Sequence, residues 1–279
     1  MRLRRKITVA FFLVSTLVSV VLAVFLYRFV ERQLETELRD KLRSIAHLGA
    51  RSIDTAAYRR LTTRLGELDD AAAAAIEQSP DWTAIYGQLR QVRAADPALI
   101  HYAYLLTPSD DPKAPRFVVD ADVLALEARL ARGEQVEDIS HFNKPYDIAE
   151  LPVLGRALDE CASLIEPELV LDKAFGVRSF SAYTPLVDPS GVALRDARGR
   201  CLGVLGVDIT DQKMTAALGS AGQLALKISI AVIGLALLVS IVMGTLLTRS
   251  VLGLSATVRR FADKDFSARA PVRSNDEIG

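Results

Sequence analysis

Aromatic and acidic side chains gather in the predicted strands of this chain, in a pattern typical of a small-molecule pocket. In the predicted strand 99–106, the alternation of side chains places Tyr102 and Tyr104 on one face. Asp120 follows three apolar residues of the next strand, and Asp208 ends another apolar strand. Further polar candidates lie on or just before a third strand: Arg178, Ser179, Ser181 and Tyr183. Tyrosine rings, an arginine and one or two carboxylates suit a small carboxylate or amino-acid-like ligand.

Each of these side chains also has an ordinary structural interpretation. Tyr102 and Tyr104 fit core positions with hydrogen-bonded hydroxyls. Asp120 and Asp208 fit caps of strands or turns. Arg178 fits an ion pair with a surface carboxylate. Both interpretations stay open on the sequence alone.

The chain shows no pattern typical of catalysis. The three histidines, His47, His101 and His141, lie far apart and lack the spacing of metal ligands. No glycine-rich phosphate loop, nucleophile elbow or metal-hydrolase signature occurs, and Gly203 and Gly206 fit close packing in a strand better than phosphate binding. We therefore predict no catalytic residue, no metal site and no cofactor, and we expect any enzymatic output beyond residue 279.

The elements that must position the candidates form a mixed pattern. Strand-like segments occur at 99–106, 116–121, 179–187 and 201–209. Helical patterns precede them at 53–68, 71–78 and 82–94. Residues 123–171 read as a helical or loop excursion, and residues 188–200 read as a hairpin connection. This order predicts one α+β domain with an antiparallel sheet, and its length of ~200 residues suffices for a core.

Two uncharged apolar stretches, Ile7–Tyr27 and Ile228–Leu247, enclose this domain. Each has about the length (~20 residues) that a transmembrane helix needs. The basic start of the chain also fits a cleaved signal peptide, but the first apolar run is longer than a signal core and has no small-x-small cleavage site. Basic residues lie before the first stretch and after the second: Arg2, Arg4, Arg5, Lys6, Arg249, Arg259 and Arg260. We therefore expect a multi-pass protein of the inner (plasma) membrane, with residues 28–226 extracytoplasmic and residues 1–6 and 248–279 cytoplasmic.

Composition excludes one class of partner and leaves the state of the cysteines open. The formal net charge is +0, and no basic stripe is present, so a nucleic-acid partner is not expected. Cys161 and Cys201 both fall in the predicted outer segment, where an oxidising compartment permits a disulfide. Two separate buried thiols are the favoured interpretation, because two cysteines alone do not define a pairing.

The first apolar stretch continues into an amphipathic helix. Its apolar residues recur at helical spacing: Val30, Leu34, Leu38, Leu42, Ile45 and Leu48. This stripe fits a seam between two subunits and also fits packing on its own domain. We expect both, with the membrane-proximal half at a homodimer contact.

Several short sequence motifs in the predicted extracytoplasmic segment resemble those of a known family. They are SID at 52–54, YAY at 102–104, FVVD at 117–120, PYD at 145–147 followed by Pro152, SAYTPL at 181–186 and GVLGVDI at 203–209. In order and spacing, segment 53–209 resembles an extracytoplasmic Cache domain, a PAS-like sensor module of bacterial receptors. The resemblance implies a small ligand on one sheet face under a lid, here Lys144–Asp147 with Tyr146 and Asp147. Capping of a short helix before Pro152 is the alternative role of those two residues.

The C-terminal segment carries a second resemblance. Val251, Leu254, Val258 and Phe261 form one apolar helical stripe, followed by DFSAR at 265–269, Pro271 and DEIG at 276–279. This sequence resembles the first helix, the connector and the start of the second helix of a HAMP linker. Ser250 stands where that family commonly has proline, and Lys264 stands where it commonly has glycine.

Together these resemblances imply the N-terminal half of a sensor histidine kinase. We expect a membrane-bound sensor that detects an extracytoplasmic small molecule and relays a conformational change through HAMP to a cytoplasmic output domain. The alternatives for the parent protein are a nucleotide cyclase, a chemoreceptor or a phosphatase. Two other classes are a membrane-anchored extracytoplasmic enzyme, for which no nucleophile–base pair is seen, and a membrane-anchored scaffold that binds a partner protein.

Overall fold

The computed structural model describes residues 2–66, 68–136, 138–196 and 198–267. It is a mixed structure of helices and an antiparallel sheet, 54% helical and 15% strand. The chain divides into two compact units: Met1–Gln33 with Gly219–Gly279, and Leu34–Leu218. The helices are α1 (Arg2–Ser52), α2 (Thr55–Thr62), α3 (Asp70–Glu77), α4 (Pro80–Ala94), α5 (Val123–Ala131), α6 (Pro152–Glu160) and α7 (Asp211–Ala262). The predicted α+β class with an antiparallel sheet is confirmed.

The first unit contains two helices that are long and apolar enough to cross a membrane. They fall within Val9–Ser52 of α1 and Gly222–Thr245 of α7. The hydroxyl of Ser240 donates to the hydroxyl of Ser15 at 3.1 Å, so the two helices touch through small side chains. Small residues allow such close approach between helices. Most large apolar side chains of these stretches are exposed, as on a surface that lipid covers.

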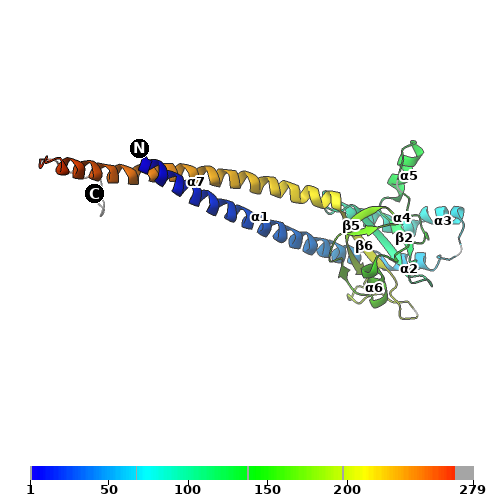
Figure 1. Ribbon diagram of the computed structural model, residues 1–279. Coiled ribbons are helices and arrows are strands. Elements are labelled where there is room, and N and C mark those ends of the chain that lie inside the picture. Colours follow the sequence, from blue (N-terminus) through cyan, green and yellow to red (C-terminus); the bar gives the residue numbers. More distant parts are fainter. Residues whose placement is uncertain (1, 67, 137, 197, 268–279) are drawn as a thin grey trace. The chain divides into compact units, whose positions relative to one another are not determined.

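The second unit is built on one six-stranded sheet (Figure 1). Its strands are β1 (Tyr102–Thr107), β2 (Arg116–Asp120), β3 (Leu164–Ile165), β4 (Val170–Asp172), β5 (Val177–Pro185) and β6 (Val204–Thr210). The order is β2-β1-β6-β5-β3, and β4 also pairs with β5. All pairings are antiparallel, and the predicted hairpin between the third and fourth expected strands is the pair β5–β6.

Helices cover one face of this sheet because alternate strand residues are apolar on that side. Ala103 and Leu105 of β1 join Leu205 and Val207 of β6 in one core cluster. Trp82 of α4 packs into this cluster, and other helical residues complete it: Leu42, Ala46, Tyr58, Leu61, Ile85 and Leu89. The predicted apolar stripe of α1 therefore packs in part on its own domain, whereas Leu48 is 66% exposed.

The other sheet face carries the second core cluster and the candidate site. Tyr104 and Leu106 of β1 point to this side together with Val204 of β6. The residues of α6 that cover it are Leu154, Ala157 and Leu158. A register shift between Leu105 and Leu106 interrupts the pairing of β1 with β2. Helix α6 and strands β3 and β4 fall in the segment that the sequence left as a helical or loop excursion.

The preference for two separate thiols is wrong. Cys161 and Cys201 form a disulfide that links the end of α6 to the segment before β6. Both sulfurs are buried beside the second cluster, and Cys161 adopts a left-handed conformation with φ 54° as the C-cap of α6. The sequence did not reveal this pairing because the two cysteines are 40 residues apart and meet only when α6 packs on the sheet.

The C-terminal part of α7 carries the stripe that resembles a HAMP helix. Helix α7 ends at Ala262, and Lys264 has φ 67°, a left-handed conformation that favours glycine. The ring of Phe261 contacts the ring of Phe266 at 5.7 Å, and Arg260 pairs with Asp265 at 2.7 Å. The remaining marks of the resemblance, Ala268, Arg269, Pro271 and DEIG at 276–279, lie outside the described residues.

Candidate functional site

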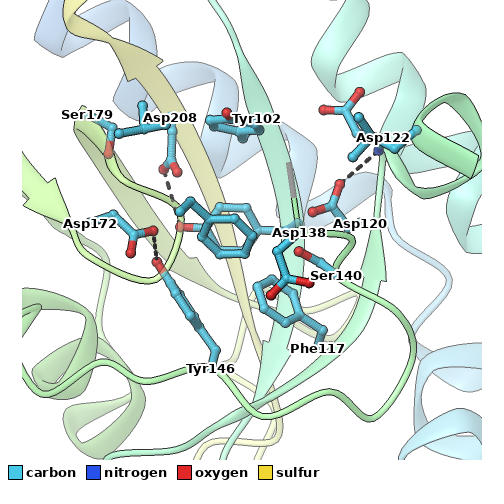
Figure 2. Close-up of a pocket in the computed structure, with 14 residues that line it drawn as sticks. Tyr102, Phe117, Asp120, Asp122, Asp138, Ser140, Tyr146, Asp172, Ser179 and Asp208 are labelled. Carbon is cyan, nitrogen blue, oxygen red and sulfur yellow. Dashed lines mark hydrogen bonds between the residues drawn. The ribbon is translucent and has the colours of Figure 1, made fainter. Parts of the chain in front are cut away.

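A cavity of about 30 Å³ lies on the sheet face opposite α4, within the second unit. This volume is large enough for about two or three water molecules. Its wall comes from β1, β2, β5, β6, the end of β4 with the β4–β5 turn, the start of α5 and the segment between α5 and α6 (Figure 2). The lining residues are Tyr102, Tyr104, Phe117, Asp120, Asp122, Leu126, Asp138, Ser140, Tyr146, Asp172, Phe175, Val177, Ser179 and Asp208. Aromatic and acidic side chains therefore dominate the wall.

Four aromatic rings form a connected group in this wall. The ring of Phe117 lies 5.8 Å from that of Tyr104, 5.1 Å from that of Tyr146 and 6.2 Å from that of Phe175, between centroids. Tyr104 and Tyr146 meet edge to face at 6.4 Å. Such rings offer π faces to a bound group as well as apolar area.

Glycine in β6 makes room for one of these rings. Gly206 lies opposite Tyr104 in the β1–β6 pair. A Cβ at Gly206 would lie 2.4 Å from Cε2 of Tyr104, and a Cβ at Gly203 would lie 2.0 Å from the hydroxyl of Tyr58 on the other face. The prediction that these two glycines serve close packing is confirmed.

Three carboxylates in the wall are held by neutral donors. The Tyr104 hydroxyl donates to Asp208 Oδ1 at 3.3 Å, and the Tyr146 hydroxyl donates to Asp172 Oδ2 at 2.6 Å. Asp120 Oδ1 accepts the backbone N–H of Asp122 at 2.8 Å. Figure 2 shows Asp208 and Asp172 on one side of the cavity and Asp120 on the other.

Burial changes the proton affinity of these carboxyl groups. Desolvation raises the pKa of Asp120 to about 7 and the pKa of Asp208 to about 7. Hydrogen bonds oppose this effect in both groups, from Asp122 and Ser140 to Asp120 and from Ser181 and Tyr104 to Asp208. Burial also raises the pKa of Tyr104 and Tyr146 well above the ordinary tyrosine value, so both hydroxyls stay protonated donors.

The two remaining aspartates of the wall have cationic partners. Arg93 forms an ion pair with Asp122, and Lys144 pairs with Asp138 at 2.6 Å. Of the described residues that line the cavity, none is a lysine, arginine or histidine. The inner wall is therefore acidic.

A second layer of polar groups stands behind Asp208. Ser179 and Ser181 are 3.3 Å apart between hydroxyl oxygens, and Tyr183 on the same face of β5 is buried. Glu166, 2% exposed, follows β3, and desolvation raises its pKa to about 7 against a hydrogen bond from Tyr183. Its Oε1 has no hydrogen-bond partner among the described residues. Within this group, Ser181 hydrogen-bonds the Asp208 carboxyl, and Ser179 also lines the cavity.

The structure brings some of the predicted site residues together and separates others. Tyr102, Tyr104, Asp120, Tyr146 and Asp208 all line the cavity. Ser181 and Tyr183 lie in the layer behind it.

Two predicted residues lie apart from the cavity. Arg178 is exposed and does not line the cavity; it lines an adjoining surface depression that shares Tyr102 and Val177 with the cavity. Asp147 is exposed, and its Oδ1 accepts the backbone N–H of Ala149, so it closes the turn before α6. The expected lid segment is hydrogen-bonded beside β2, through Phe117 N–H to Lys144 O and Tyr146 N–H to Pro115 O.

Several lining residues were missed. Asp172 and Phe175 belong to the β4–β5 hairpin, and Asp122, Asp138 and Ser140 lie in the segments around α5. The hairpin had a sequence signal, because Gly176 at φ 68° separates VLD from VRSF. The residues around α5 had none, since their position depends on how the excursion folds over the sheet.

One histidine lies near two glutamates. Possible ligand atoms of Glu77, Glu127 and His141 lie within 4.8 Å of one another. The Glu77 carboxylate accepts the backbone N–H of Phe142 at 2.6 Å and contacts His141 Nδ1 at 3.2 Å, which accounts for its burial. Sequence spacing did not reveal this proximity.

Comparison with protein-family models and with curated proteins finds no match for this chain. The assignment of function therefore depends on the geometry of the cavity and its connections.

Proposed function

We propose that this protein is a membrane-bound sensor whose outer domain, residues 28–226, binds a small molecule in the cavity and signals through α1 and α7. In this proposal the domain is Cache-like, the segment 248–279 is the start of a HAMP linker, and the output domain is that of a histidine kinase. The domain faces the extracytoplasmic side of the inner membrane, and the protein acts as a homodimer.

One observation carries this proposal: the strand that supplies Asp208 runs directly into a membrane-length helix. Strand β6 ends at Thr210, and α7 begins at Asp211. In the first turn of α7, Lys213 donates to the carbonyl oxygens of Pro97 and Ile100 at 2.6 Å, just before β1. A ligand that moves β6 relative to β1 therefore acts on the start of α7.

The signal follows from differential binding. A ligand shifts the balance between two conformations only by its difference in affinity for them. A small movement of α7 along or about its axis is the change that a second conformation would require. The HAMP-like helices would then shift between two packing arrangements, and this shift would change the activity of the output domain.

Crosslinking tests the proposal. Leu48 of α1 is exposed, so a Leu48→Cys variant reports the approach of a second α1 without disturbing the core. We expect disulfide-linked dimers in membranes, in a yield that changes when a cavity ligand is added. Dimers whose yield is the same with every compound that binds the cavity would contradict signalling. Protection of residues 28–226 from protease added to spheroplasts, from which the outer layers have been removed, would contradict the orientation.

A further inference from the structure

The cavity wall contains more carboxyl groups than the nearby arginine and lysine side chains can pair with. Asp120 and Asp208 are 7% and 6% exposed, and each is held by hydroxyl or backbone N–H donors. Asp172 accepts from the Tyr146 hydroxyl and from the N–H of Ala174. Arg93 and Lys144 are already paired with Asp122 and Asp138. Because buried carboxylates are unfavourable without a counter-charge, this wall is suited to a cationic occupant.

The acid groups lie at two ends of the cavity. Asp120 is opposite Tyr104 on β2, and Asp208 is opposite Tyr102 on β6, with β1 between them. Two strand spacings (~10 Å) across and two residues (~7 Å) along place their Cα atoms about 12 Å apart. Asp172 adds its carboxylate on the Asp208 side (Figure 2).

Aromatic rings line the cavity between its two acidic ends. Tyr104, Phe117, Tyr146 and Phe175 form one connected group in the lining. Ring faces attract ammonium groups and pack well against methylene groups. A linear ligand with a positive charge at each end and methylene groups between them would place its charges at the carboxylates and its methylene groups against the rings.

A metal ion does not match it. One ion needs its ligand atoms around a single point. Among the described residues, the group of three potential ligands within 4.8 Å is Glu77, Glu127 and His141, and it contains none of the three cavity carboxylates. A ligand carboxylate is also disfavoured, because no described basic side chain faces the cavity.

We propose that the cavity binds a linear aliphatic diamine, with one ammonium group near Asp208 and Asp172 and the other near Asp120. This inference rests on the proposed function, because it names the ligand class of the same sensor site. Entry of the chain requires Phe175, half-buried on the β4–β5 turn, to move outward, because the cavity of about 30 Å³ is narrow.

The test measures binding to the full 279-residue chain in detergent micelles at pH 7.5 by calorimetry. The probes are 1,4-diaminobutane, butylamine and butyrate. We expect the diamine to bind at least about tenfold more tightly than butylamine, and butyrate not to bind. Asp208→Asn and Asp120→Asn should each weaken diamine binding about tenfold or more, which corresponds to the loss of about 1.4 kcal/mol.

The control is Asp147→Asn, which makes the same chemical change at an exposed position outside the cavity. It should bind the diamine as the unmodified chain does. Circular dichroism and the fluorescence of Trp82, which is buried on the opposite sheet face, report whether each variant is folded. If Asp208→Asn does not fold, Asp120→Asn alone provides the test.

Two results would overturn the diamine proposal. Diamine binding that is equal in Asp208→Asn, Asp120→Asn and Asp147→Asn would reflect surface charge only. Binding of butyrate but not of the amines, lost in Tyr104→Phe, would show a cavity sensor for another ligand class and leave the proposed function intact. Failure of the proposed function is separate, because it appears as unchanged Leu48→Cys crosslinking with a ligand that does bind.

Discussion

The ring of Tyr104 lies directly over Gly206, its partner on the neighbouring strand. A Cβ at Gly206 would come within 2.4 Å of Cε2 and 2.5 Å of Cζ of that ring. The same tyrosine donates to Asp208, so this contact between a ring and a glycine places the hydroxyl that holds the carboxylate.

Gly206→Ala is therefore expected to destabilise the second unit and to weaken the proposed diamine binding together. The added methyl group displaces the Tyr104 ring, and overpacking of this kind lowers the free energy of unfolding by about 1–3 kcal/mol. Urea unfolding followed by Trp82 fluorescence measures the loss. Gly87→Ala is the control, because a Cβ at that position in α4 would meet no atom within 4 Å beyond the neighbouring backbone of its own helix. This variant should be neutral or stabilising by up to about 1 kcal/mol. Equal stability of the two variants would contradict the contact.

The raised pKa of Asp208, about 7, predicts how stability depends on pH. In the unfolded chain the group titrates near its ordinary pKa of about 4. Between these values the native state keeps a proton that the unfolded state releases, so this group makes stability fall as the pH rises from about 4 to 7, and the loss is complete above 7. Asp208→Asn removes the contribution of this group to the pH dependence, so between pH 5 and pH 8 the variant should gain about 2–3 kcal/mol relative to the unmodified chain.

Urea midpoints at pH 5 and pH 8 measure that difference. Asp147→Asn, at an exposed carboxylate, should follow the pH profile of the unmodified chain. Parallel profiles for Asp208→Asn and the unmodified chain would show that Asp208 is not protonated at pH 5 in the native state.

The disulfide between Cys161 and Cys201 should contribute substantially to stability. It closes a loop with a sequence separation of 40, and a cross-link of that length stabilises a native state by about 2–4 kcal/mol in the chain-entropy description. Unfolding of the paired Cys161→Ala and Cys201→Ala variant, compared with the oxidised chain, measures the effect. Unchanged unfolding after both thiols have been freed by reductant would contradict it.

Arg93→Ala is expected to destabilise the domain by about 2–4 kcal/mol, because it leaves the buried carboxylate of Asp122 without its ion pair. Arg129→Ala removes an exposed pair with Glu134, whose side chains are 46% and 41% accessible, and should cost less than about 1 kcal/mol. Thermal unfolding of both variants under one set of conditions provides the comparison. A larger loss of stability for Arg129→Ala than for Arg93→Ala would contradict the importance of the buried ion pair.

The strands were predictable because their patterns are local. Apolar residues that alternate with Tyr102 and Tyr104 identify β1, and the glycine and aspartate residues of 188–200 mark the connection from β5 to β6. The predicted helix 53–68 was too long, because Thr63 caps α2 and Gly66 at φ 156° follows it. Asp54 starts α2 by accepting the N–H groups of Ala56 and Ala57, a signal that the sequence does carry.

The candidate site was only partly predictable, because its wall comes from distant segments. Tyr104 and Asp208 were found from their place on apolar strands. Asp172 and Phe175 enter through the β4–β5 hairpin, which the sequence left inside an irregular segment. The acidic character of the cavity emerges only in three dimensions, since Arg178, expected to face the ligand, is exposed on the adjoining depression and does not line the cavity.

The bond between Cys161 and Cys201 encloses β3, β4 and β5 in a covalent ring that contains Asp172 and Phe175. Tyr104, Asp120 and Asp208 lie outside that ring. Substitutions of Asp172 and Phe175 would change one wall of the cavity, while strand β5 of the same ring pairs with β6, the strand that continues into α7. The covalent ring therefore supplies one wall of the cavity, and Asp208, on the strand that continues into α7, belongs to the part of the wall outside it.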